Sequence, residues 1–226
     1  MTNSRLYARA GQAYEQAGLP LEAARCYGAA GEHRRAADLL VRMGEYSAAV
    51  EEYRRAEQLD VAAWILVHHL ADPVAARFVI ERHGDQPTTA WRVLHGSALR
   101  ISLVMARCNL AEGGGPRDAL PVLGAASDSL ENPDYAYDPF VEQWAVAIAE
   151  YAGRFDQVAL LFAASVRGHR LGSTQRWQEW SRRVLGMELS IPPPDQRAAD
   201  SLSLSEREFN DFMENLQLDS FPLDPG

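Results

Sequence analysis

The sequence contains no lysine, so all 22 of its basic residues are arginine. Two interpretations stay open: codon bias, and selection against modification directed at lysine. Cysteine is almost as scarce, and the two that occur, Cys26 and Cys108, do not form a C-x-x-C pair. Two isolated cysteines exclude a disulfide framework. Both are expected to behave as small buried hydrophobes.

Long apolar runs are absent as well. No stretch approaches the roughly 18 residues that a membrane-spanning helix needs. The first residues, MTNSRLYARAG, contain no apolar segment of the kind that a signal peptide carries. These absences lead us to expect a cytoplasmic protein that does not enter a membrane.

Acidic residues outnumber basic ones, which gives a net charge of −9. Nucleic acids and anionic membranes select basic surfaces, so neither is expected as a partner. The charge is also uneven along the chain. From Ile191 onward there are eight acidic and two basic residues, a net charge of −6, which leaves −9 + 6 = −3 for residues 1–190.

No arrangement typical of a catalytic or metal site is present. Adjacent histidines on a helix point about 100° apart, which makes it hard for both to face one ion, and no H-E-x-x-H or Cys/His spacing occurs. The glycine-rich stretch 112–116 lacks the G-K-[ST] of a phosphate-binding loop. Helix-surface or satisfied core positions are expected for His68, His69, His83, His95 and His169. The sequence therefore predicts no enzyme activity, no cofactor and no metal.

What the sequence does have is a 13-residue period. Glycines stand at 18, 31 and 44, an alanine follows each after five residues, and a larger residue follows four positions later. The alanines are Ala23, Ala36 and Ala49, and the larger residues are Tyr27, Leu40 and Tyr53. Ten helical residues rise about 15 Å, and a glycine with positive φ then ends the helix. Helices this short are not stable alone, so the period predicts helices that pack on their neighbours.

Residues 7–30 resemble the tetratricopeptide repeat (TPR). In that repeat, helix A carries a large residue, a small–Gly pair and a tyrosine, and helix B carries glycine, alanine, an aromatic and alanine. The matching residues are Tyr7, Ala10-Gly11 and Tyr14 for helix A, and Gly18, Ala23, Tyr27 and Ala30 for helix B. The helix B half returns at Gly44, Ala49, Tyr53 and Ala56.

The repeat is shorter than an ordinary TPR. The two helix B glycines are 26 residues apart instead of about 34, and no closing proline follows. The chain therefore resembles TPR-like repeats with shortened helices, of the kind found in the α-SNAP-like superfamily. The resemblance implies an all-α fold, a TPR-like α-solenoid of antiparallel helix pairs.

Helices are also predicted over the rest of residues 1–190. The predicted helical segments are 59–84 (a pair), 88–113, 117–130, 138–153, 154–168 and 173–189. Asp72 is placed to cap a helix that begins with Pro73, and Pro121 shortens or kinks the start of its own helix. Trp177 and Trp180 share one face of the last helix. Roughly ten helices and no strand are expected in this helical-repeat domain.

By the same resemblance, helix A side chains between the core positions form a partner-binding face. They are Arg5, Ala8, Gln12, Glu15, Arg34, Asp38 and Val41. Arginine suits the binding of a carboxylate or an acidic peptide, and the alternative for each residue is an ordinary solvated helix face. The predicted function is a non-enzymatic scaffold or adaptor that binds a protein or peptide. The alternative, by analogy of fold, is a regulatory or sensor subunit of a bacterial signalling or defence assembly that gates a partner enzyme or ATPase. The oligomeric state is left open.

The C-terminal tail, residues 191–226, is predicted to be a Pro-rich linker and a flexible acidic segment with a short amphipathic helix at about 206–217. Ser205 and Glu208 match a capping box. Apolar residues then recur at i, i+3, i+4 and i+7, at Phe209, Phe212, Met213 and Leu216. Three roles for this stripe stay open: a cap for the array, a recognition helix for a partner's groove, and occlusion of the array's own face.

Overall fold

The computed structural model describes residues 2–81 and 96–190, and in these residues the protein is all-α, with no strand. The helices are α1 (Thr2–Gln16), α2 (Pro20–Ala30), α3 (His33–Arg42), α4 (Tyr46–Arg55), α5 (Leu59–His68), α6 (Pro73–Glu81), α7 (Gly96–Ala111), the 3-10 helix η2 (Pro116–Ala119), α8 (Leu120–Glu131), α9 (Pro139–Tyr151), α10 (Phe155–Arg167) and α11 (Ser173–Leu185). The predicted all-α class is confirmed, and the predicted tail helix lies outside the described residues.

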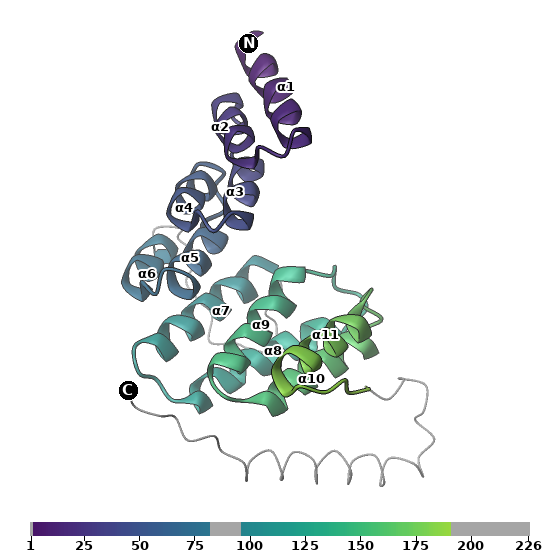
Figure 1. Cartoon of the computed structure of the whole chain (residues 1–226). Helices are drawn as coiled ribbons and strands as arrows, with labels where there is room; N and C mark the ends of the chain where they lie inside the picture. The colour runs from purple at the N-terminus through teal and green to yellow at the C-terminus, as the bar shows by residue number, and fades with distance from the viewer. Residues whose placement is uncertain (1, 82–95, 191–226) are drawn as a thin grey trace, which may run out of the picture.

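The helices fall into an arm and a body. Helices α1 to α6 follow one another along an extended arm, with the N-terminus at its far end, and α7 to α11 form a more compact body (Figure 1). Each helix of the arm packs on the next one in the chain. In the body α8 and α9 both pack on α10. One continuous cluster of buried apolar side chains runs from α3 to α11, and a smaller one joins α2 and α3.

The turns of the arm share one geometry, which explains the 13-residue period. Gly18, Gly31 and Gly44 have φ of +72°, +84° and +75°. After each turn, the next backbone N–H donates to the carbonyl five residues back, at 2.9 Å each time: Leu19 to Tyr14, Glu32 to Tyr27, and Glu45 to Leu40. These are the bonds of a Schellman helix end, where glycine accepts the left-handed conformation without strain.

A fourth turn of the same kind falls on a residue that is not glycine. Glu57 lies 13 residues after Gly44, has φ of +58°, and is followed by the same bond from Gln58 N–H to the Tyr53 carbonyl at 2.9 Å. The alanine series also continues, since Ala62 is fully buried like Ala49. The glycine count in the sequence therefore understates the length of the repeat, which extends into α5.

This pair of turns gives a matched stability test. Glu57→Gly is expected to raise the free energy of unfolding by about 0.5–1 kcal/mol, because it removes a left-handed non-glycine residue. Gly44→Ala is expected to lower it by about 1 kcal/mol. A Cβ at Gly44 would meet nothing within 4 Å, so only backbone conformation is tested. Urea unfolding followed by circular dichroism measures both, and equal stability of all three proteins would contradict the assignment of this turn.

At Ala10-Gly11, the small–Gly pair of the repeat, helices α1 and α2 approach each other closely. A Cβ built on Gly11 would stand 2.7 Å from Cε1 of Tyr27, and Tyr27 is fully buried. Tyr7 and Tyr14, the other two aromatic positions of this repeat, are 47% and 39% exposed. Helix α1 therefore buries its small residues against α2 and leaves large apolar side chains on its outer faces.

Most of the remaining local predictions are also confirmed. The Ala75 N–H donates to Asp72 Oδ1 at 2.8 Å, so Asp72 caps α6, which begins at Pro73. A 3-10 turn precedes Pro121 at the second position of α8. Trp177 and Trp180 are both buried, and their rings stack with centroids 5.5 Å apart.

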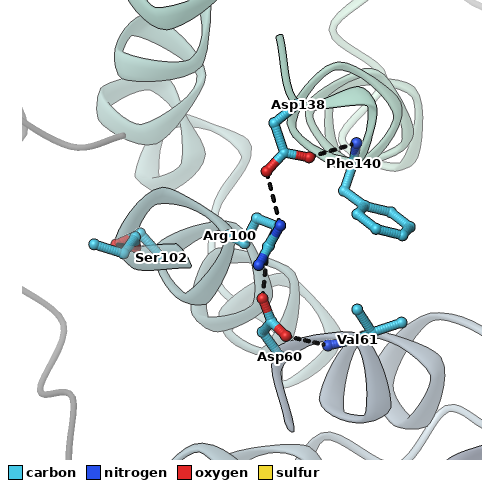
Figure 2. A network of polar contacts seen from close by, with 7 residues as sticks. Asp60, Val61, Arg100, Ser102, Asp138 and Phe140 are labelled. Carbon is cyan, nitrogen blue, oxygen red and sulfur yellow. Dashed lines mark hydrogen bonds and ion pairs between the residues drawn. The ribbon is translucent and has the colours of Figure 1, made fainter. Parts of the chain in front are cut away.

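Helices α5 and α6 of the arm both pack on α7 of the body, and α7 packs on α9. The side chains of α5, α7 and α9 meet in layers. At one end Arg100 of α7 lies between Asp60 of α5 and Asp138, the N-cap of α9 (Figure 2). Its Nε donates to Asp60 Oδ2 at 2.5 Å and its Nη1 to Asp138 Oδ2 at 2.8 Å. In the middle, Trp64 stacks on Trp144 with ring centroids 4.7 Å apart. We call the end with these two carboxylates the Arg100 layer.

Candidate partner-binding surfaces

The predicted face on α1 and α3 is only partly available to a partner. Arg5, Gln12, Arg34 and Asp38 are exposed. Among the described residues, the side chains of Arg5, Gln12 and Arg34 make no hydrogen bond. Ala8 is half-buried, and Val41 is half-buried against the core. The exposed part of the face is therefore its polar and charged part.

Glu15 instead joins three helices of the arm. Its Oε2 accepts from the Tyr27 hydroxyl at 2.9 Å and from Arg35 Nη2 at 2.8 Å, and Arg42 lies 3.5 Å from Oε1. The hydrogen bond from Tyr27, followed by the one from Arg35, holds the pKa of the Glu15 carboxyl below its usual value. The Arg35 guanidinium also lies 4.1 Å from the centre of the Tyr27 ring. Glu15 thus stabilises the packing of α1, α2 and α3.

Asp38 joins α3 to α4 through the corresponding tyrosine of the next helix pair. Its Oδ1 accepts from the Tyr53 hydroxyl at 2.6 Å. Burial, and then this hydrogen bond, raise the pKa of Tyr53 above its usual value. Both predicted face carboxylates therefore accept from the tyrosine that the 13-residue period places in the next helix B. The period marked these tyrosines as core, but nothing in the sequence pairs their hydroxyls with acids on the preceding helix A.

The outer end of the arm adds contact residues that sequence reasoning did not include. Leu6 is 62% exposed, and Arg9 is exposed on the same helix. Helix α1 packs chiefly on α2, so its other faces stay in contact with solvent. Exposed apolar side chains beside arginines are typical of surfaces that bind proteins.

A second surface lies along the other edge of the arm, where α2 and α4 run (Figure 1). A groove of about 690 Å³ is lined there by small and apolar residues together with charged ones. The small residues are Ala24, Gly28, Ala29 and Ala48. Glu52 lies at its border, held by His33 at 2.8 Å and Arg55 at 2.6 Å. This groove therefore combines small and apolar residues with charged side chains of both signs.

The body contains a larger cleft of about 830 Å³ between α9 and α11, with the end of α5 at one side. Its apolar lining includes Val146, Phe162 and Trp180. Side chains tie its two walls together. Arg176 donates to Glu142 at 2.5 and 3.0 Å, and Trp180 Nε1 donates to Glu150 at 3.1 Å. These partners are 34 and 30 residues apart, so no local pattern in the sequence points to the cleft.

Glu142 is a buried carboxylate with a complete set of partners. It is 3% exposed, and besides Arg176 it accepts from the Ser165 hydroxyl at 2.5 Å. A buried carboxylate that is hydrogen-bonded on both oxygens is stable where it is. Glu142 therefore holds α9, α10 and α11 together, and nothing in its geometry marks it as a general base.

Asp60 lies at one end of the packed helices α5, α7 and α9. At the opposite end, buried polar side chains lack hydrogen-bond partners among the described residues. Arg107 of α7 is 6% exposed, and its Nε and Nη1 are buried without a hydrogen-bond partner among the described residues. Its guanidinium carbon lies 3.5 Å from the centre of the Tyr151 ring. His68 Nδ1 is likewise buried and unpartnered. His68 and Tyr151 line the cleft. We call this end, with His68, Arg107 and Tyr151, the Arg107 layer.

Burial and charge keep His68 neutral. Burial is the main cause, and the nearby His69 and Arg107 add to it, so that the pKa of His68 falls to about 4. At neutral pH its ring therefore carries no charge beside the Arg107 guanidinium. His68 stacks on Trp64, with ring centroids 4.8 Å apart, and His69 stacks on Tyr46 at 4.2 Å. Both rings serve as aromatic packing groups.

The described residues contain no group of three or more histidine, cysteine or acidic side chains that could hold a metal ion. His83 and His95 lie outside these residues. Cys108 is buried, and burial raises the pKa of its thiol to about 11. Its thiolate, the nucleophilic form, is therefore scarce at neutral pH.

Comparison of the chain with protein-family models, with curated proteins and with solved structures gives no match. Among the helices of residues 2–81 and 96–190, none combines the length and the apolar character that crossing a bilayer requires. The argument about function therefore depends on the surfaces themselves.

Proposed function

We propose that this protein is a non-enzymatic interaction module, a TPR-like α-solenoid whose arm binds a protein or peptide partner. The observation that carries the proposal is the repeated helix end: four successive turns with one hydrogen-bond geometry stack short helices into an arm. Each helix of such an array buries one face on its neighbours and presents another to solvent. A long exposed surface on a regular scaffold suits the recognition of an extended partner.

The basic edge of the arm favours an acidic partner segment. Five arginines on α1 and α3 are exposed: Arg5, Arg9, Arg34, Arg35 and Arg42. Arg35 and Arg42 lie within 4 Å of Glu15, whereas the side chains of Arg5, Arg9 and Arg34 have no carboxylate partner among the described residues. Arginine binds carboxylates through paired N–H groups. A partner with acidic side chains is therefore the chemistry that this edge matches best.

Charge reversal at two positions tests the proposal. The double variant Arg5→Glu and Arg34→Glu is expected to weaken partner binding at least about tenfold, since like charges across an interface repel. Native-host lysate is passed over immobilised wild-type and variant protein, and the bound proteins are quantified by mass spectrometry. Both residues are exposed, so stability is expected to stay unchanged.

Arg117→Glu is the matched control, because Arg117 is exposed on η2, away from the arm. A partner retained by wild type and by Arg117→Glu but lost by the double variant supports the basic edge as the binding surface. Equal capture by all three proteins would exclude this edge and leave the groove between α2 and α4 as the surface to test next.

A further inference from the structure

Helices α1, α3 and α5 are the three helix A members of the repeat, and two of them are covered by the helix B that precedes them. On α3, Ala36 and Leu39 are 0% and 2% exposed, because they pack in one cluster with Ala23, Ala24 and Tyr27 of α2. On α5 the positions two periods later are Ala62 and Ile65, which are also buried, and α5 packs on α4.

The same positions on α1 are not covered. Two periods before Ala36 and Leu39 stand Ala10, which is half-buried, and Ala13, which is exposed. Leu6, Tyr7 and Tyr14 on this side are 62%, 47% and 39% exposed. Helix α1 packs chiefly on α2 and lies at the far end of the arm (Figure 1). We call this side the open face of α1, and it consists of Leu6, Tyr7, Ala10, Ala13, Tyr14 and Ala17.

The open face is apolar along the whole helix. The charged residues of α1, which are Arg5, Arg9 and Glu15, lie outside the arc that its side chains form. Large apolar side chains that stay in water at a charge-free face are typical of an interface. Because α3 and α5 bury the corresponding face against a helix, an α-helix is the partner that this face fits.

The repeat also indicates which kind of helix covers such a face. The covering helices carry an alanine and, four residues later, a tyrosine: Ala23 with Tyr27 on α2, and Ala49 with Tyr53 on α4. Helix α1 carries the same pair on its open face, at Ala10 and Tyr14. A second copy of the chain therefore supplies a helix of the required chemistry. A twofold axis would pair the two α1 helices in antiparallel directions, as tight turns do for consecutive helices of the arm.

The open face is complementary to itself in that arrangement. With the axis between Ala10 and Ala13, Leu6 of one copy lies opposite Ala17 of the other, so that a large side chain meets a small one at both ends. Tyr7 lies opposite Tyr14, which forms an aromatic pair on one flank. On the other flank Arg9 lies opposite Gln16, and no like charges meet.

We propose that two copies of the chain associate through the open faces of their α1 helices, which pair antiparallel and join the two arms end to end. The inference does not rest on the proposed function, because Arg5 and Arg34 of the basic edge lie outside the contact. One helix pair is smaller than the about 800 Å² per partner of a standard interface. The dimer is therefore weak, with a dissociation constant on the order of 10 µM or higher.

Sedimentation velocity of the full chain, over concentrations that bracket this value, tests the association. Leu6→Glu is expected to raise the dissociation constant at least about tenfold, because it places a charge in an apolar contact. Ala17→Arg, at the other end of the contact, is expected to weaken association for the same reason. Both positions are exposed, so circular dichroism and thermal stability of the monomer should not change. Gln12→Glu, exposed on the opposite side of α1, is the matched control and keeps the association of the wild type.

A mixture of the two variants tests the antiparallel pairing. In a mixed dimer the introduced carboxylate faces the introduced guanidinium at one end, and Leu6 faces Ala17 at the other. An equimolar mixture of Leu6→Glu and Ala17→Arg is therefore expected to recover association that neither variant has alone. In a parallel pair each position would face its own copy, and the mixture would recover nothing.

Each outcome decides the matter. Association that is lost in both single variants, kept in Gln12→Glu and recovered in the mixture supports the proposal. A monomer at every concentration overturns it, and so does association that Leu6→Glu and Ala17→Arg leave unchanged. Loss in the single variants without recovery in the mixture overturns the antiparallel pairing. These measurements use the purified chain alone, so their failure is distinct from failure of the proposed function.

Discussion

Replacing Arg100 with methionine is expected to lower the free energy of unfolding by about 3 kcal/mol, near the lower end of the cost of breaking a buried ion pair. Asp60 is 6% exposed, so without Arg100 it becomes a buried carboxylate that lacks its counter-charge. Asp138 loses the same partner at the N-terminus of α9. Urea unfolding followed by circular dichroism gives the change.

A rescue variant identifies the cause. Asp60→Asn in the Arg100→Met protein removes the stranded charge and keeps an oxygen to accept from the Val61 N–H, which donates to Asp60 Oδ1 at 2.9 Å. It is expected to recover a substantial part of the loss. Arg117→Met on the exposed η2 controls for the removal of an arginine and should change stability by less than about 0.5 kcal/mol. No recovery in the double variant would mean that Arg100 acts through packing instead of charge.

The Arg100 layer also contributes to the attachment of the arm to the body. The α5 helix is the last place where the 13-residue period is found, and it packs on α7 of the body, as α6 also does. Asp60 belongs to the first turn of that helix. Loss of Arg100 therefore weakens one of the two helix contacts that attach the arm to the body, and separate unfolding transitions of arm and body are an expected consequence.

Local features of the fold followed well from the sequence. Gly18, Gly31 and Gly44 marked three helix ends, and Asp72 with Pro73 marked a helix start, because each depends on the conformation of a few neighbouring residues. Glu57 shows the limit of this reasoning. Its positive φ is imposed by the packing of α4 and α5 on either side, and the side chain at that position gives no sign of it.

The candidate surfaces were less predictable for a different reason. Helical periodicity indicates which face of a helix is apolar, but it does not indicate which distant helix a polar side chain meets. The pairs Arg100 with Asp60 and Arg176 with Glu142 span 40 and 34 residues. Glu15 looked like a surface residue by its place in the repeat, yet it accepts from Tyr27 on the next helix.

Tyr27→Ala is expected to cost about 3–5 kcal/mol, the range for emptying an aromatic core site. Tyr27 is fully buried, its ring touches the α1 backbone at Gly11, and its hydroxyl donates to Glu15. Tyr27→Phe keeps the ring and is expected to cost only about 1 kcal/mol, the usual value of one hydrogen bond. Urea unfolding of both variants separates the ring from the hydroxyl, and a cost below about 1 kcal/mol for alanine would contradict the repeat assignment.

A double-mutant cycle between Gly11 and Tyr27 then tests whether the close approach of α1 and α2 is what the ring fills. Gly11→Ala alone is expected to cost about 1–3 kcal/mol, because its Cβ would overlap the ring and force one helix to shift. In the Tyr27→Ala background that overlap is gone, so the same substitution should cost little, or stabilise α1 slightly through the better helix propensity of alanine. Coupling between the two sites identifies direct contact. Additive effects would show that α1 lies elsewhere than against Tyr27.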